Sequence, residues 1–312
     1  PTAAGGNGLS QPLWVDTDSD MIADVIYAGD LKGNLWKFDV KSSNPTEWKV
    51  AFEGRPLFKA QATDGNAATF QPVTGAPEFA FHPKGGLVVT FGTGKAFSNV
   101  DFPDTSGRPH SVYGIWDKTS YASMTASELD ANLPRLRSSL QARTLSRVAS
   151  GDGYVTGDAI DWSTKLGWYF NLPVSSEMVV SNVMLTSIKL LGVVSISPVI
   201  GSTSCSSAPD AYVTFIDPIT GLLPQNVLGL IDVDVGGTTK KLNIASKKLA
   251  SGDQMVTIAR DRTNKTSATG LTGETARNNC IRVVGDKTDL TLCSQGQDRR
   301  IQWRELFNFR TR

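Results

Sequence analysis

Short apolar runs separated by glycine, proline and aspartate dominate this sequence and restrict the chain to an all-β fold. The 29 glycines and 15 prolines are scattered between these runs. Short segments rich in valine, isoleucine and aromatic residues, bounded by turn residues, are typical of β-strands. The runs are DVIYAGD, NLWKFDV, GLVVTFG, SVYGIWD, GWYFNLP, EMVVSNVML, LLGVVSIS and AYVTFIDP.

Two segments share one local pattern, AGDLKGNLWKFDV and APDAYVTFIDPITG. Each has a turn, an apolar strand that ends near phenylalanine, and an aspartate that opens the next turn. This is the rhythm of a four-stranded propeller blade, whose faces are buried by neighbouring blades. We therefore expect residues 1–312 to form a modified β-propeller domain, or the C-terminal part of one. We distinguish about four or five candidate blades, fewer than the length holds at roughly 45 residues each, so an incomplete ring is expected.

The stretch 125–148 departs from the β pattern and predicts a short helical insertion. Its leucines have helical spacing: Leu129, Leu133, Leu136 and Leu140. Thr125 or Ser127 can cap the start, and Pro134 is expected to break or kink the helix. Its arginines are expected on a solvated helix face rather than in a patch for an anionic surface: Arg135, Arg137, Arg143 and Arg147. The polar stretches 202–209 and 261–277 are expected to be loops.

Composition and charge narrow the class of protein. The chain is 40% hydrophobic and 20% charged, which suits a folded domain with a large core. With 31 basic and 30 acidic residues and no basic patch with interleaved aromatics, nucleic-acid binding is not expected. The sequence has no apolar run long enough for a membrane span and no signal peptide at residues 1–10. Because it begins without methionine, we expect a segment of a longer protein.

The three cysteines are Cys205, Cys280 and Cys293, and none has the spacing of a zinc or thioredoxin-type site. Cys280 and Cys293 flank two short predicted strands around Gly285, which can bring them within bridging distance. A disulfide there would fit an oxidising compartment. Two alternatives remain open, namely three buried free thiols and a pairing that involves Cys205.

The sequence DTDSDMIAD, residues 16–24, is the motif that predicts a metal-binding site. It places carboxylates at Asp16, Asp18, Asp20 and Asp24, which are positions 1, 3, 5 and 9 of a short loop. Ca²⁺ takes six to eight oxygen ligands, and the backbone carbonyl of Ile22 is expected to supply one at position 7. Four carboxylates so close together would repel one another without a cation, which favours a calcium site over a solvated acidic turn. Magnesium fits less well because it prefers fewer protein ligands.

This loop is not an EF-hand. Tyr27 stands where an EF-hand has its bidentate glutamate, and the chain enters a predicted strand directly after Asp24. Position 6, which usually holds glycine because the backbone turns with positive φ, is Met21. We therefore expect local strain and a weakened affinity at this position.

With this loop, WVDTDSDMIADVIYAGDLKGNLWKFDV resembles the signature stretch of the PilC/PilY family of type IV pilus biogenesis factors. Further motifs similar to the family follow in order: VVTFGTGK, SVYGIWDK, GWYFNLP with EMVVSN, AYVTFIDPITG, and RRIQWREL at 299–306. The resemblance implies calcium ligands at Asp16, Asp18, Asp20 and Asp24. It also implies that calcium controls pilus extension and retraction, with roles in twitching motility and adhesion. The implied partners are pilins, minor pilins, the pilus assembly machinery and a host-cell receptor. The implied location is the periplasm or outer membrane, the cell surface and the pilus tip.

The alternative function is that of a periplasmic quinoprotein dehydrogenase, since GNLWKFD and IDPITG also resemble blade motifs of pyrroloquinoline quinone enzymes. Those enzymes commonly have adjacent cysteines, which this chain lacks, and their metal ligands come from distant blades. The segment GTGK does not fit a phosphate loop, and His82 and His110 give little support for a catalytic triad. An enzyme is therefore not expected, and an integrin-like propeller lacks the GNLWKFD and WREL matches. Six of the seven tryptophans are expected to pack between blades: Trp14, Trp36, Trp116, Trp162, Trp168 and Trp303.

Overall fold

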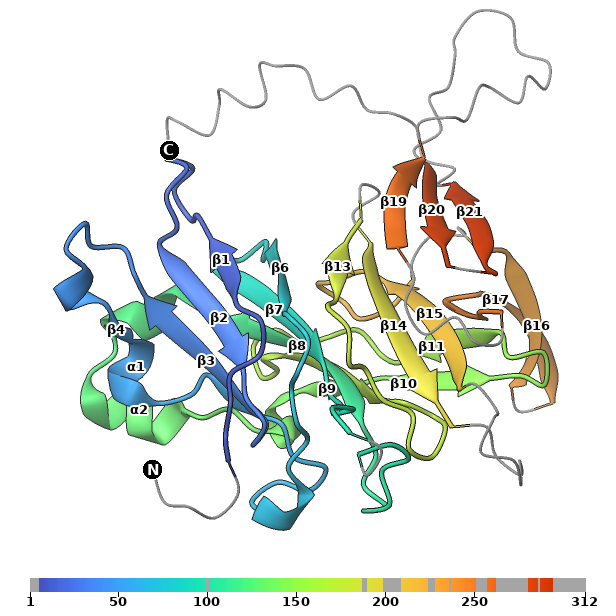
Figure 1. Cartoon of the computed structure of the whole chain (residues 1–312), viewed down its shortest axis with the longest axis horizontal. Helices are drawn as coiled ribbons and strands as arrows, with labels where there is room; N and C mark the ends of the chain where they lie inside the picture. Colours follow the sequence, from blue (N-terminus) through green and yellow to red (C-terminus); the bar gives the residue numbers. More distant parts are fainter. Residues whose placement is uncertain are drawn as a thin grey trace, which may run out of the picture.

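The computed structural model confirms the all-β prediction (Figure 1). The structure describes residues 6–98, 101–186, 190–198, 209–223, 228–235, 237–250, 257–261, 280–285 and 287–293. These residues form five sheets, which do not join into a closed ring. The segments 202–208, 262–277 and 299–306 and the residues Cys205 and Trp303, on which predictions were made, lie outside the described residues.

The first sheet is formed by the N-terminal part of the chain. Its order is β1-β2-β3-β4, and β5 also pairs with β3. The strands are β1 (Leu13–Val15), β2 (Val25–Gly29), β3 (Asn34–Asp39), β4 (Lys49–Val50) and β5 (Phe58–Lys59). The predicted strands DVIYAGD and NLWKFDV are thus β2 and β3, joined by a tight turn.

The second sheet lies beside the first and has the order β6-β7-β8-β12-β9 (Figure 1). Its strands are β6 (Glu78–Phe81), β7 (Leu87–Gly92), β8 (Ser111–Asp117), β12 (Gly167–Asn171) and β9 (Gln141–Ala142). All pairs are antiparallel except β9 with β12.

The third sheet combines strands from distant parts of the sequence, in the order β10-β11-β18-β15-β14-β13. They are β10 (Thr144–Arg147), β11 (Gly153–Thr156), β18 (Ser246–Lys248), β15 (Asp210–Ile216), β14 (Leu191–Ser197) and β13 (Met184–Leu185). Two small sheets complete the described chain. They contain β16 (Leu230–Val235) with β17 (Thr238–Asn243), and β19 (Thr257–Asp261) with β20 (Cys280–Val284) and β21 (Asp289–Cys293).

Strand β8 shows how the sheets share their cores. All of its residues are buried, and successive side chains point to opposite faces of the sheet. Tyr113 and Ile115 join the core shared with the first sheet, whereas Val112 joins the core shared with the third. A central blade buries both faces in this way, which explains why SVYGIWD reads as a nearly continuous apolar run.

Trp168 on β12 joins two of the recognised motifs. It is fully buried, and its indole Nε1 donates to the carbonyl of Pro218 at 3.0 Å. A Cβ added at Gly114 or Gly221 would lie 2.4 Å from the indole ring, so both positions require glycine. The motifs GWYFNLP and IDPITG are therefore in contact. The packing prediction is confirmed for Trp168 and Trp116 and is wrong for Trp14, which is 57% exposed on β1.

The turn of GDLKGNLWKFD is organised by the buried carboxylate of Asp30. One oxygen accepts from the backbone N–H groups of Lys32 and Asn34, at 2.8 and 2.9 Å. The other accepts from the Asn34 side chain and from Trp36 Nε1, both at 2.8 Å. At Gly33, φ is +80° and a Cβ would lie 2.5 Å from the carbonyl oxygen of Ala60. The aspartate, glycine, asparagine and tryptophan of this motif thus all stabilise the β2–β3 turn.

The helix predicted within 125–148 is present but shorter. It is α2 (Ala126–Asn132), and Thr125 forms a capping box with Glu128 at its start. The helix ends before Pro134, as predicted, because the residue preceding a proline disfavours the helical region. The rest of the stretch forms the 3₁₀ turn η4 (Arg137–Ser139) and the strands β9 and β10. The remaining short helices are α1 (Ala51–Gly54), η1 (Pro45–Glu47), η2 (Ala67–Thr69) and η3 (Thr119–Ser123).

The arginines of this stretch do not lie on a solvated helix face, so that prediction was wrong. Arg137 and Arg143 are buried, and Arg147 forms a buried ion pair. Arg137 donates to Asn171 at 2.8 Å and to Gln71 at 3.0 Å, and its guanidinium lies over the ring of Tyr169. Leucine spacing predicted a helix with a polar side, but Arg137 lies in the turn η4, Arg143 lies between β9 and β10, and Arg147 ends β10.

The hairpin predicted between Cys280 and Cys293 is confirmed. Strands β20 and β21 are antiparallel, and the register places Cys280 directly opposite Cys293. This register is compatible with the predicted bridge, which stays a prediction.

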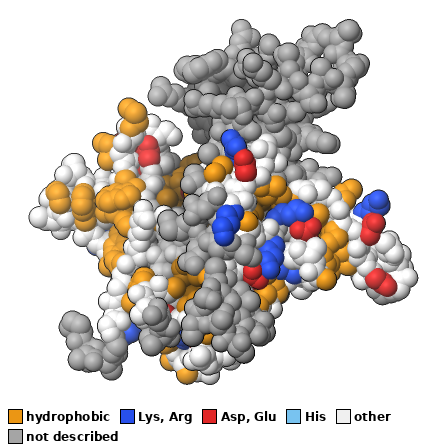
Figure 2. All heavy atoms as spheres, turned by 45° about the vertical axis from the view of Figure 1, so that its right-hand side comes forward, with side chains coloured by type: hydrophobic (Ala, Val, Ile, Leu, Met, Phe, Trp, Pro, Cys, Tyr) orange, Lys and Arg blue, Asp and Glu red, His pale blue; other side chains and the backbone are white. Residues whose placement is uncertain are grey.

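Charged groups on the surface are mixed in sign. On the face shown in Figure 2, basic and acidic side chains lie next to one another rather than gathering by sign. Lys247 pairs with Asp152 at 2.8 Å and Lys248 with Asp210 at 2.7 Å. Among the helices of the described chain, none is long and apolar enough to cross a bilayer.

The ion pair of Arg147 and Glu177 predicts a large stability effect. The two N···O distances are 2.5 and 2.8 Å, and the side chains are 7% and 0% exposed. Arg147→Met leaves a buried carboxylate unpaired, so the free energy of unfolding should fall by about 3–5 kcal/mol in urea titrations. Lys248→Met, which breaks a more exposed pair in the same sheet, should cost less than about 1 kcal/mol. Equal losses in the two variants would contradict this account.

Candidate metal centre

The acidic loop, residues 16–24, connects β1 to β2 at one end of the first sheet. Both of its ends are held by backbone hydrogen bonds. The N–H of Asp24 donates to the carbonyl of Val15 at 2.9 Å, and the N–H of Val40 donates to the carbonyl of Asp24 at 2.9 Å. The loop is therefore anchored to β1 and to the end of β3, and its last aspartate is buried.

Three of the predicted carboxylates converge. Asp16, Asp18 and Asp24 each offer an oxygen, and these oxygens all lie within 4.8 Å of one another. Asp24 is buried, Asp16 is half-buried and Asp18 is exposed, so the cluster opens to solvent on one side. An all-oxygen set of three carboxylates on an open loop suits a hard cation such as Ca²⁺, with water completing the coordination.

Asp16 shapes the loop through its backbone partners. One of its oxygens accepts from the N–H groups of Asp18 and Ser19 at 3.1 and 2.6 Å, and the other accepts from Met21 at 2.8 Å. Burial acts to raise the pKa of Asp16, but these N–H donors, Met21 foremost, outweigh it and hold the pKa below its usual range. Asp16 therefore stays ionised well into the acid range.

Asp24 is held ionised by different partners. Its Oδ2 accepts from the backbone N–H of Thr17 at 2.7 Å and from the Thr17 hydroxyl at 2.5 Å. Burial acts to raise the pKa of Asp24, but Thr17 and the charge of Lys41 outweigh it and keep the pKa below its usual range. A buried carboxylate that is ionised at neutral pH is a strong attractor for cations.

Lys41 lies beside the cluster and was missed by the sequence analysis. Its ammonium is 2.9 Å from Asp18 Oδ2 and 3.4 Å from Asp24 Oδ1. Hydrogen bonding to Asp18 and the charge of Asp24 raise the pKa of Lys41, so it is protonated at neutral pH. The predicted pairing of β2 with β3 could have indicated this contact. It places Asp39 opposite Val25, directly after the acidic loop, and Lys41 follows two residues later.

The structure does not place Asp20, a further predicted ligand, in the cluster. Oδ1 of Asp20 accepts from the backbone N–H of Ile22 at 2.8 Å, and Asp20 is not among the three convergent carboxylates. The side chain of Ile22 is 65% exposed. Ligation by Asp20 and by the Ile22 carbonyl stays a prediction.

The backbone of the loop has the positive φ expected at its sixth position, Met21. Met21 has φ of +70° and Ser19 has φ of +67°, both in the left-handed region that favours glycine. The Met21 side chain is 95% exposed and gains no burial for this conformation. The strain expected at Met21 is thus present in the backbone.

The two histidines are parts of the packing between loops and strands. His110 is buried, with Nε2 3.0 Å from Asp104, and burial lowers its pKa. The ring of His82 stacks on Trp116 with centroids 4.1 Å apart.

Comparisons with known proteins agree on one family. The family model of the PilY1 β-propeller domain matches residues 2–150. The type IV pilus biogenesis factor PilY1 of Pseudomonas aeruginosa is 34% identical over 251 residues, which cover 69% of this chain and 21% of that protein. A PilY1 homologue of Xylella fastidiosa is 32% identical over 182 residues, covering 57% of this chain and 12% of its own length. The chain thus spans about a fifth or less of these relatives.

The fold is also found in a solved structure. The crystal structure of the Pseudomonas aeruginosa PilY1 C-terminal domain superposes with a TM-score of 0.68 at 24% identity. The match covers 94% of this chain and 61% of that domain. The modified β-propeller prediction is thereby confirmed.

Met21→Gly tests the strain in the loop. Because glycine adopts positive φ without steric cost, the free energy of unfolding should rise by about 1 kcal/mol. The measurement is equilibrium unfolding in urea without calcium. Ile22→Gly is the matched control, since Ile22 is also exposed but lacks positive φ, and it should be neutral or destabilising. A Met21→Gly variant no more stable than the parent would show that the loop relaxes around Met21.

Proposed function

Because this chain belongs to the PilY1 family of type IV pilus biogenesis factors, we propose that it is a calcium-binding regulatory domain of a pilus assembly protein. In this proposal, calcium binding controls whether pili extend or retract, and the protein supports twitching motility and adhesion. Its partners would be pilins, minor pilins and the assembly machinery, with a host-cell receptor as a further candidate. The protein would act at the cell surface and at the pilus tip.

The convergence of three carboxylates carries the calcium part of the proposal. Asp16, Asp18 and Asp24 would hold the ion, and Asp20 and the Ile22 carbonyl are further candidate ligands. Bound Ca²⁺ would supply positive charge that offsets the repulsion between these carboxylates. Lys41 already offers one positive charge to Asp18 and Asp24, which supports a preference of this site for cations.

The shape of the loop suggests how occupancy would be sensed by a partner. Met21 and Ile22 are 95% and 65% exposed, so the acidic loop presents two apolar side chains to solvent. Their backbone N–H groups bond to Asp16 and Asp20, respectively. A movement of the Asp16 or Asp20 carboxylate on calcium binding would therefore also move the backbone that carries Met21 and Ile22. The free energy available for regulation is the difference in calcium affinity between the partner-bound and free states.

Asp24→Asn tests the proposed calcium site. The substitution keeps the size of the side chain and removes its charge, so calcium affinity should fall about tenfold or more. The measurement is calorimetric titration of calcium into chelator-treated protein, with folding checked by urea unfolding. Glu47→Gln, which changes an exposed acid in η1 outside the loop, should leave the affinity unchanged.

The same pair of variants tests regulation in cells. Introduced into the full-length protein, Asp24→Asn should make the number of surface pili independent of external calcium, while Glu47→Gln should behave as the parent. Unchanged calorimetric affinity in Asp24→Asn would refute the ligand set. Lost affinity with pilus numbers that still respond to calcium would refute the regulatory role alone.

Lys41→Gln should strengthen calcium binding. The Lys41 ammonium repels a cation at Asp18 and Asp24. Two unit charges about 4 Å apart in water interact by about 1 kcal/mol, so the repulsion of doubly charged Ca²⁺ is about 2 kcal/mol, which is about thirtyfold in affinity. The same titration measures this, and the gain should shrink as salt concentration rises. Lys49→Gln, which removes an exposed charge outside the loop, is the control. An affinity lower than that of the parent would mean that Lys41 supports the site rather than competing with the ion.

A further inference from the structure

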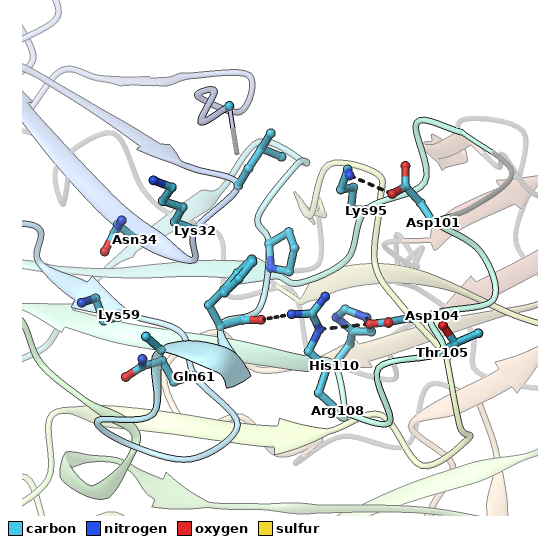
Figure 3. A pocket seen from close by; sticks show the side chains of 15 residues that line it. Lys32, Asn34, Lys59, Gln61, Lys95, Asp101, Asp104, Thr105, Arg108 and His110 are labelled. Carbon is cyan, nitrogen blue, oxygen red and sulfur yellow. Dashed lines mark hydrogen bonds and ion pairs between the residues drawn. The ribbon is translucent and has the colours of Figure 1, made fainter. Parts of the chain in front are cut away.

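A recess of about 670 Å³ lies at the opposite end of the first sheet from the acidic loop. It is bounded by the β2–β3 turn, the segment that follows β5 and the loop between β7 and β8 (Figure 3). This volume falls in the range of small-molecule sites, roughly 300–1,000 Å³. The recess is separate from the proposed metal centre and plays no part in that proposal.

One wall of the recess contains cations that are already neutralised. In the β7–β8 loop, Lys95 pairs with Asp101 at 2.7 Å. Arg108 pairs with Asp104 at 3.1 Å and also donates to the carbonyl of Phe70 at 2.8 Å. Figure 3 shows both pairs on the same side of the recess. Neither pair leaves a net charge for a ligand.

The other wall contains cations without such partners. Lys32 lies in the β2–β3 turn and Lys59 on β5, and neither forms an ion pair with any residue in the described ranges. Figure 3 shows the two lysines on the opposite side from Lys95 and Arg108. The neighbouring carboxylate of Asp30 lines a separate, smaller recess and is held by its own turn. The wall of Lys32 and Lys59 therefore carries two uncompensated positive charges.

Gln61 adds a buried donor to this wall. Its side chain lines the recess although the residue is only 3% exposed. Its Oε1 accepts from the N–H of Gly65 at 3.1 Å, which assigns the oxygen of the amide. Within the described part of the chain, the amide nitrogen has no acceptor, so it is available to a ligand. Leu31, Phe70 and Pro72 line the same recess and give it apolar surface.

We propose that this recess binds a small organic dianion with two carboxylates, which would contact Lys32, Lys59 and the amide of Gln61. Ammonium groups act as point charges and accept carboxylates in many orientations. Bidentate recognition of phosphate or sulfate favours a free guanidinium, and the guanidinium of Arg108 is already bonded to Asp104 and Phe70. The apolar lining accommodates a short carbon chain, which inorganic anions lack.

The test is calorimetric titration of glutarate into metal-free protein at low ionic strength. Glutarate should bind, and it should bind more tightly than butyrate, which has one carboxylate, and than sulfate. The double variant Lys32→Gln/Lys59→Gln should lose about tenfold or more in glutarate affinity, since a hydrogen bond to a charged group is worth about 1.5–3 kcal/mol. Gln61→Leu should weaken binding without changing the net charge.

The double variant Lys49→Gln/Lys84→Gln is the matched control, because it removes the same charge from exposed positions outside the recess. It should leave glutarate affinity within about twofold of the parent. An equal loss of glutarate affinity in both double variants would mean that the effect comes from the net charge of the protein rather than from the recess, and it would overturn the proposal. Absence of glutarate binding to the folded parent, or tighter binding of sulfate, would also overturn it.

Discussion

The junction between the first two sheets depends on one buried carboxylate, Asp117 at the end of β8. It accepts hydrogen bonds from the hydroxyl of Tyr27 on β2 at 2.5 Å and from the ammonium of Lys37 on β3 at 2.7 Å. Burial, then the charge of Asp117, raises the pKa of Tyr27 well above its usual range, so the phenol remains a donor. Three side chains from two sheets meet at this charge, and their hydrogen bonds to Oδ2 offset part of the cost of burying it, while Oδ1 has no partner among the described residues. The position of β2, and hence of both of its ends, follows from that contact.

Buried arginines extend the same constraint along the chain. Arg137 bonds to neutral groups, among them Gln71 and Ser111, while Arg147 bonds to the carboxylate of Glu177. Such groups are costly to bury, and they are tolerated here because each has several fixed partners. Since these partners come from segments distant in the sequence, the arginines specify how the segments are placed relative to one another.

The two ends of the first sheet have opposite electrostatic character. The acidic loop gathers three carboxylates, and the recess at the other end presents Lys32 and Lys59. The Pseudomonas aeruginosa and Xylella fastidiosa relatives described above are type IV pilus biogenesis factors. The chain spans about a fifth of the Pseudomonas aeruginosa protein.

Local spacing alone was enough to place the strands around DVIYAGD and NLWKFDV, the acidic loop and the start of α2, because each depends on residues close together in the chain. Periodicity failed at 137–147, where leucine spacing suggested a helix and the chain instead forms a turn and two short strands. Arg147 is buried because it pairs with Glu177, and Lys41 lies beside the acidic loop because β2 pairs with β3. Contacts between residues distant in sequence arise from the packing of sheets, and no local pattern encodes which distant side chain will neutralise a buried charge.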